Sequence, residues 1–298
     1  MSFAEIVMLV LKLSIILTVF VIGLNATFAD ATYLFRNPVK LLKGILSMNA
    51  VMLVVALLLV SLFNLHPAVK VALVVLALSP VPPFIPNKAI KAGGTESYTI
   101  GLLAATGVLS IALVPLTLEL LQRIFDIALG MPTSSVAQVV LVSVLVPLLL
   151  GVALRTVAPA FATKIKKPLS LIALAMMVLS ALPLIVGSWS AIWSLIGNGT
   201  VVALVAFGLI GLGVGHLLGG PLLPERIVLG ICTAARHPAI AIGIAVTNFS
   251  HQKLATPAIL LYLIVSSIVT IPYMQWVKRL EERANSNGSE GLRAAAGR

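Results

Sequence analysis

The stretch RIVLGICTAARHPAIAIGIAVTN, Arg226–Asn248, decides the fold that this chain can adopt. It is apolar enough to lie in a lipid bilayer, yet Arg236, His237 and Pro238 interrupt it in the middle. An arginine at the centre of a membrane helix costs about 2.5–3.5 kcal/mol on insertion scales. A proline beside it removes a backbone donor and disfavours helical geometry in the residue before it. These residues predict a membrane helix that is broken near its middle, as in many secondary transporters.

The composition of the whole chain agrees with a membrane protein. Hydrophobic residues make up 60% of the sequence and charged residues only 10%, whereas soluble domains carry about 25% charged residues. Runs of the length that spans hydrocarbon, about 20 residues, recur along the sequence. They lie at about residues 5–27, 43–64, 67–81, 98–121, 136–158, 168–187, 200–218, 226–248 and 255–277, with 82–97 as a weaker tenth candidate. We therefore expect an all-α polytopic membrane protein.

The net charge of +11 favours a membrane topology rather than nucleic-acid binding, because the basic residues sit in short connections and in the tail 278–298. With ten spans and the N-terminus inside, thirteen basic residues fall on the inner side and five on the outer side. The expected location is the cell (inner) membrane with both termini cytoplasmic. The five outer residues would be Arg36, Lys40, Lys43, Arg123 and Lys253.

The two halves of the chain resemble each other. FRNPVKLLKG (Phe35–Gly44) and KIKKPLSLIA (Lys164–Ala173) each join basic residues and a proline to a new apolar run. A proline-broken segment follows in both halves: SPVPPFIPNKAIKAGG (Ser79–Gly94) in the first and TAARHPAIAIG (Thr233–Gly243) in the second. Five spans repeated would have opposite orientations in the membrane. A separate row, Gly211, Gly215 and Gly219, indicates close helix packing rather than a phosphate-binding loop.

The broken segments are the expected functional site. Asn87 is a good N-cap for a half-helix starting just after it, and Pro238 suits a first helical position with His237 as the cap. Two helix N-termini that meet near the midplane would attract an anion. Arg236 lies about 15 Å of helix rise into its span without an acidic residue at that depth. It could therefore pair with a carboxylate or sulfonate of a substrate, or bind backbone carbonyls structurally.

At these segments the chain resembles the bile acid:sodium symporter family over nearly its full length. The family's first-half signature, a Cys-Pro-Gly-Gly-rich break ending in Ser-Asn before a Ser/Thr-rich helix, corresponds to SPVPPFIPN and then YTIGLLAATGVLSIALVP. Asn87 matches the signature asparagine, Pro86 replaces its serine, and Thr106 matches a hydroxyl of the following helix. The family's second motif, Glu-x-Gly-x-Gln-Asn, falls on CTAARH, so that Cys232 stands for its glutamate and Arg236 for its glutamine.

The resemblance implies about ten transmembrane helices in two inverted five-helix repeats. Residues 1–65 and 136–195 (spans 1, 2, 6 and 7) would form a panel, and residues 66–130 and 200–277 a core with two crossed, broken helices. Relatives carry organic anions, usually with sodium, and bind them between panel and core. Arg236, His237 and Asn87 are then the expected substrate-binding residues.

The resemblance implies no cofactor, but it implies sodium as a possible coupling ion. The residues that would bind this sodium are altered in this chain. A sodium ion prefers several oxygen ligands, and a cation 4 Å away would repel it by about 4 kcal/mol at an effective dielectric constant of 20. The remaining candidate ligands are Asn87, Thr99, Thr106, Ser110 and Cys232.

The sequence therefore favours a secondary transporter of an organic anion that resembles sodium-dependent symporters but has altered sodium-site residues. Our hypothesis is that Arg236 permanently supplies the positive charge that sodium supplies in relatives, which would make transport independent of sodium or weakly dependent on it. Two alternatives are a proton-coupled carrier that uses His237 and a non-transporting membrane receptor of the same fold. The residues offer neither a nucleophile paired with a base nor a metal-ligand cluster, so we expect no enzyme and no metal site. The expected partners are the small anion and the lipid bilayer, and no protein or nucleic-acid partner is inferred.

Overall fold

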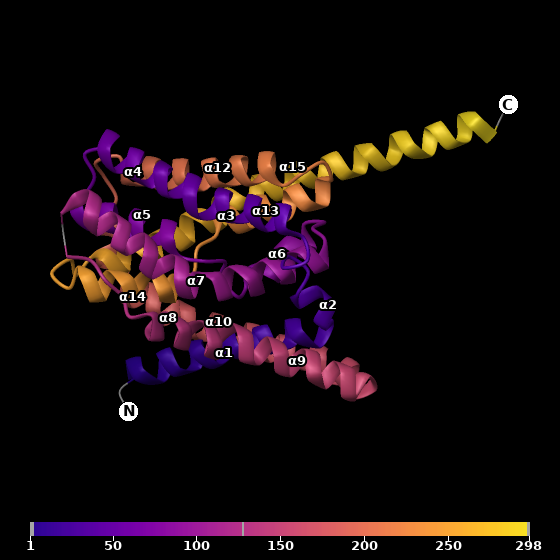
Figure 1. Cartoon of the computed structure of the whole chain (residues 1–298), viewed down its shortest axis with the longest axis horizontal. Coiled ribbons are helices and arrows are strands. Elements are labelled where there is room, and N and C mark those ends of the chain that lie inside the picture. Colours follow the sequence, from indigo (N-terminus) through magenta and orange to yellow (C-terminus); the bar gives the residue numbers. More distant parts are fainter. Residues whose placement is uncertain (1–2, 127, 297–298) are drawn as a thin grey trace.

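The computed structural model describes residues 3–126 and 128–296, which fold into a bundle of helices without a strand in these ranges (Figure 1). The first four crossings precede the gap at residue 127, and the second and third are composite. They are α1 (Phe3–Asn25); α3 (Pro38–Ile45) with the π-helical turn η1 (Leu46–Val51) and α4 (Met52–Leu62); the broken pair α5 (Pro67–Leu78) and α6 (Ile85–Lys91); and α7 (Glu96–Phe125).

Five further crossings follow the gap, and the short helices α2 (Phe28–Ala31) and α11 (Trp189–Ser194) lie in connections. The five are α8 (Thr133–Val140) with η2 (Leu141–Leu145) and α9 (Val146–Val157); α10 (Pro159–Gly187); α12 (Thr200–Leu218); the broken pair α13 (Leu223–Ala234) and α14 (Pro238–Asn248); and α15 (Ala255–Ala296). Helices α3, α5, α10 and α14 start at a proline, whose missing N–H costs nothing at the first position.

The weak tenth candidate, residues 82–97, is not a separate span. It contributes α6 and the first residues of α7. Helix α6 has seven residues and rises only about 10 Å, too little to cross hydrocarbon about 30 Å thick. Helices α5 and α6 together form a single crossing, so the described residues form nine crossings of the bundle.

The two ends of the chain consequently leave the bundle on opposite sides (Figure 1). An odd number of crossings requires this arrangement, because each crossing reverses the side of the chain. Nine crossings differ from the ten spans on which the expectation of two cytoplasmic termini was based. The difference arises because α5 and α6 are the two halves of one broken crossing rather than separate spans.

The helices fall into two groups. Helices α1, α9 and α10 pack on one another, at the bottom of the view in Figure 1. The second crossing, residues 38–62, packs instead against α5, α12 and α13. The predicted panel, residues 1–65 and 136–195, thus differs from the observed grouping at its second span, whose neighbours belong to the predicted core.

The repeat is inverted, as the resemblance implies, but its register differs from the expected one. A broken crossing lies between α4 and α7 in the first half and between α12 and α15 in the second. These are the third and eighth crossings, so they run in opposite directions. Phe35–Gly44 begins the second crossing whereas Lys164–Ala173 lies in the sixth. These two segments run in the same direction, so they are not equivalent positions of the inverted repeat.

Glycines allow α12 to approach α13 closely, as the row of small residues predicts. A Cβ atom on Gly215 would lie 2.3 Å from the Leu229 carbonyl oxygen, and one on Gly219 would lie 2.4 Å from the Arg226 Cα atom. Gly213 of the same helix has no atom within 4 Å of the corresponding position. The row therefore fixes the position of the first half of the second broken crossing.

We expect Gly215→Ala to lower the free energy of unfolding by about 1–3 kcal/mol, because backbone atoms cannot move aside for the new methyl group. Gly213→Ala is the matched control, and it should be neutral or stabilise α12 by about 0.5–1 kcal/mol. Thermal unfolding of the two purified variants in detergent measures the difference. Equal melting temperatures would contradict close packing at Gly215.

Candidate functional site

The two breaks meet inside the bundle, as the sequence predicts. The backbone N–H of His237 donates a hydrogen bond to the Pro80 carbonyl oxygen at 3.0 Å. Around this contact α14 packs on α5, and α13 packs on α6. Helices α5 and α13 end at the crossing, while α6 and α14 begin there. The crossing therefore collects the partial negative charge of two helix C-termini and the partial positive charge of two N-termini.

Arg236 lies at this crossing and is fully buried. Its Nη1 donates a hydrogen bond to the Ser79 carbonyl oxygen at 3.3 Å, just beyond the last residue of α5. Its Cζ atom lies 5.9 Å from the centre of the Phe207 ring. The carbonyl end of α5 and the face of this ring both stabilise a positive charge.

No carboxylate in the described ranges forms an ion pair with Arg236; the pairs found there are Lys40–Glu225 and Arg123–Glu119. The Nε and Nη2 atoms of Arg236 also lack a hydrogen-bond partner. Burying an ion costs several kcal/mol unless its partners compensate. The crossing is therefore electropositive, with two guanidinium nitrogens, Nε and Nη2, whose N–H groups are unused.

The crossing around Arg236 is completed by residues that the sequence analysis did not single out. The Tyr262 hydroxyl of α15 donates to the Ala234 carbonyl oxygen at the end of α13. The rings of Tyr262 and Phe207 pack edge to face, with centroids 5.4 Å apart. The hydroxyls of Ser47 and Thr233 form a buried hydrogen bond of 2.7 Å, which ties the π-helical turn η1 to α13. Each lies in an ordinary apolar run, so hydropathy alone could not single it out.

His237 is the N-cap residue of α14 and Pro238 its first residue, as expected. The imidazole does not cap the helix, however, and it is 2% exposed with no partner for either ring nitrogen. It is the neighbour of Arg236 in sequence, so unsatisfied polar atoms of both residues are buried at the same break.

Asn87 does not begin the first half-helix. Helix α6 starts at Ile85 with Phe84 as its N-cap residue, because Pro86 fits the first turn and needs no acceptor there. Asn87 therefore lies inside that turn, with an exposed side chain. The expectation that Asn87 caps the half-helix is wrong, and the structure does not bring it into the buried cluster around Arg236.

The other candidate ion ligands are buried but separate from Arg236. Thr99, Thr106 and Ser110 all lie on α7, and each hydroxyl donates to a carbonyl of its own helix at 2.6–2.7 Å. Cys232 is fully buried in α13. In the described ranges none of these four side chains shares a hydrogen bond with Arg236 or His237.

A polar cluster joins the connection after α1 to the start of α7. The Asp30 carboxylate accepts hydrogen bonds from the Ser97 hydroxyl and from the backbone and hydroxyl of Thr27. Burial acts to raise the pKa of Asp30, but the hydrogen bonds from Ser97 and Thr27 outweigh it, so the pKa lies below its ordinary value of 3.8. The ionised carboxylate is thus the form that stabilises this connection.

Because its folded pKa is lowered, Asp30 contributes stability above its unfolded pKa and loses it as the pH falls through the folded value. We expect Asp30→Asn to lower the free energy of unfolding by about 1 kcal/mol at neutral pH, through loss of charge-assisted hydrogen bonds. The loss should shrink at an acid pH well below 3.8, as the wild-type carboxyl becomes protonated through its lowered pKa. Thermal unfolding at both pH values measures this, and a loss independent of pH would contradict the assignment.

A helical membrane bundle with two crossed, discontinuous helices from inverted repeats is the architecture of a secondary transporter. Comparison with known families agrees, because residues 12–195, more than half of the chain, match the sodium bile acid symporter family. The chain belongs to this family, as the resemblance in the sequence predicted. None of the curated proteins matches the chain. The family match ends before α12, so the description of the second broken crossing rests on the structure.

Proposed function

We propose that this protein is a secondary transporter of an organic anion that works by alternating access, with Arg236 as a resident cation in place of a coupling sodium ion. The observation that carries the proposal is the fully buried guanidinium at the crossing, without an ion pair in the described ranges. It donates to the carbonyl end of α5, where a bound metal cation would otherwise find its ligands. The unused N–H groups of its Nε and Nη2 atoms suit an oxyanion.

The proposed substrate has an anionic head and an apolar body. The guanidinium and the N-terminus of α14 supply the positive potential for the head. The panel helices α1, α9 and α10 are rich in Leu, Val, Ile and Met, which suit an apolar body. The substrate reaches the head site only in a conformation that differs from this one, because Arg236 has no exposed surface here. That requirement agrees with alternating access.

Counterflow in proteoliposomes tests transport against binding alone. A thermal-shift screen of organic acids first selects an anion that stabilises the purified protein. Vesicles loaded with the unlabelled anion should then accumulate the labelled one transiently without any ion gradient. Stabilisation without counterflow would instead identify a membrane receptor of the same fold.

A proton-coupled carrier is a second candidate, favoured by the buried imidazole of His237, whose two nitrogens lack partners. In that case an inward proton gradient would accelerate uptake by the wild type, and His237→Gln would remove the acceleration. Uptake that is independent of the gradient in both proteins would exclude this mechanism and leave the carrier with Arg236 as its resident cation.

The distribution of the basic residues supports one orientation of the protein in the membrane. Between residues 3 and 280 twelve lie at the end of the bundle where α3, α7 and α13 begin, three lie at the other end, and Lys12 and Arg236 lie between. By the positive-inside rule the first end is cytoplasmic. The twelve are Arg36, Lys40, Lys43, Lys88, Lys91, Arg155, Lys164, Lys166, Lys167, Arg226, Lys278 and Arg279; the three are Lys70, Arg123 and Lys253.

We propose this orientation, with the N-terminus outside and the C-terminus inside the cell. Cys232 is the single cysteine, so Cys232→Ser gives a background for single labels at the exposed positions Asn198 and Thr163. An impermeant maleimide should label Asn198→Cys in intact cells, and Thr163→Cys only after permeabilisation. The reverse pattern would contradict the orientation.

A further inference from the structure

A second site lies at the basic end of the bundle, away from the crossing. A cavity of about 320 Å³ opens between the start of α3, Tyr98 of α7, the Gly219–Pro221 turn and Glu225 of α13. Its volume is at the lower end of the range for small-molecule sites, about 300–1,000 Å³. Pro38, Val39, Tyr98 and Pro221 supply apolar walls, while Arg36, Lys40 and Lys43 bring positive charge.

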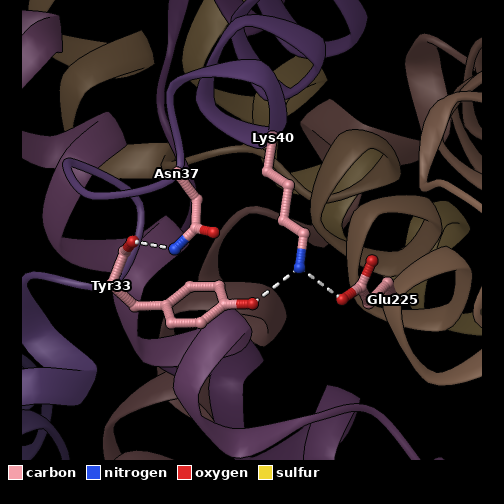
Figure 2. A network of polar contacts seen from close by, with 4 residues as sticks. All are labelled: Tyr33, Asn37, Lys40 and Glu225. Atoms are coloured by element: carbon pink, nitrogen blue, oxygen red, sulfur yellow. Dashed lines mark hydrogen bonds and ion pairs between the residues drawn. The ribbon is translucent and has the colours of Figure 1, made fainter.

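The charges around this cavity do not cancel. Lys40 Nζ lies 2.6 Å from Glu225 Oε1 and also donates to the Tyr33 hydroxyl at 2.6 Å (Figure 2). This pair uses the one carboxylate of the lining, and Glu225 is 5% exposed. Arg36 and Lys43 remain without an ion pair in the described ranges. The lining therefore carries two positive charges in excess.

The backbone adds hydrogen-bond donors at the same wall. Helix α3 begins at Pro38, so the N–H groups of Val39 and Lys40 have no acceptor within the helix. Asn37, the N-cap residue, makes no capping bond, since its amide donates instead to the Tyr33 carbonyl oxygen at 2.7 Å (Figure 2). The partial positive charge of the helix end thus adds to the charges of Arg36 and Lys43.

The opposite wall is kept open by a glycine. Gly220 has a φ of +103°, which disfavours any residue with a side chain. A Cβ atom there would also lie 3.3 Å from Glu225 Oε2. Arg226 Nε donates to the Gly220 carbonyl oxygen at 2.6 Å and holds the turn in this conformation.

We propose that this cavity binds a phosphate group with two negative charges, held by Arg36 and Lys43 over the start of α3. The excess charge of the lining matches a dianion, and free backbone N–H groups at a helix start suit phosphate. The group belongs either to a soluble phosphorylated compound of the cytoplasm or to an anionic lipid, since the cavity opens at the basic end of the bundle. This site is independent of the anion site proposed at Arg236.

Calorimetric titration of inorganic phosphate into the purified full chain in detergent tests the site. The variant Arg36→Gln with Lys43→Gln should weaken phosphate binding about tenfold, because two charge-assisted contacts are lost. Lys70→Gln with Lys253→Gln removes the same charge at the opposite end and should leave the affinity unchanged. No binding by the wild type, unchanged affinity in the first variant, or equal weakening in both would overturn the proposal. Matching melting temperatures of the two variants show that the difference is not one of folding.

Reconstitution distinguishes the two sources of the phosphate group. The titration is repeated in vesicles of phosphatidylcholine alone and in vesicles that also contain phosphatidic acid. If phosphatidic acid occupies the site, proteins that keep Arg36 and Lys43 should bind phosphate in the first vesicles but lose this binding in the second. That result would assign the site to a lipid headgroup. Equal binding in both vesicles would assign it to a soluble compound.

Discussion

Replacing Arg236 by methionine is expected to reduce anion transport by about 100-fold while the protein stays folded. The lost interactions are hydrogen bonds to a charged group, each worth about 1.5–3 kcal/mol, and about 1.4 kcal/mol corresponds to tenfold in rate. Folding should survive because Arg236 is buried without a carboxylate partner in the described ranges. An apolar side chain of similar length avoids the desolvation of that charge. Initial uptake rates and thermal unfolding measure the two effects.

Arg236→Lys is the matched control for this substitution. It keeps the charge but loses the planar donor arrangement of guanidinium, so it should retain part of the transport that Arg236→Met loses. A methionine variant that transports at the wild-type rate would give Arg236 a structural role only. Loss of folding in both variants would also show that the hydrogen bond to Ser79 and the contact with Phe207 are structural requirements.

Restoring the family's second motif is expected to make transport depend on sodium. The triple variant Cys232→Glu, Arg236→Gln, His237→Asn places the glutamate, glutamine and asparagine of that motif on the end of α13 and the break. It removes a cation that would repel sodium by about 4 kcal/mol at 4 Å, for an effective dielectric constant of 20. It also adds an anionic oxygen ligand, and the Ser79 carbonyl oxygen no longer accepts from Arg236.

The measurement for this variant is uptake at a series of sodium concentrations, with choline as the replacement ion. The single variant Arg236→Gln is the control, because it removes the cation without supplying the anionic ligand. We expect sodium-stimulated uptake in the triple variant and little uptake in the single one. A folded triple variant that transports equally well in choline would show that the resident cation and the sodium ligands are not alternatives.

The sequence is sufficient to predict the parts of the fold that follow from the backbone properties of proline and glycine. Single prolines such as Pro115 lie inside continuous helices here. Four prolines within Ser79–Gly94, or a proline next to the charge of Arg236, disfavour a continuous helix more strongly, so both breaks could be located. The spacing of Gly211, Gly215 and Gly219 likewise leaves one face of α12 without side chains, which predicts a close neighbour.

Features that depend on which helices are neighbours could not be predicted in this way. Hydropathy shows that a run lies in lipid but not which run it packs against, so residues 38–62 were assigned to the panel although they pack on α5, α12 and α13. The ion pair of Lys40 with Glu225 joins residues 185 positions apart. The contacts of Tyr262 with Ala234 and of Phe207 with Arg236 at the crossing likewise join residues of different helices.

For a related reason, the number of membrane spans could not be predicted from the sequence around α6. Its seven residues follow three prolines, include a fourth and carry two lysines, a pattern that fits either a weak span or half of a broken one. Only the packing of α6 against α13 decides between them. That decision also underlies the proposed orientation, in which the two termini lie on opposite sides of the membrane.

The most direct test of a resident cation at the crossing is uptake by the unmodified protein in proteoliposomes, with either sodium or choline as the external cation. The probe is the labelled organic anion that the thermal-shift screen selects. Because Arg236 supplies the positive charge permanently, the initial rates should be equal in the two solutions. A steep dependence of the initial rate on sodium would contradict the account.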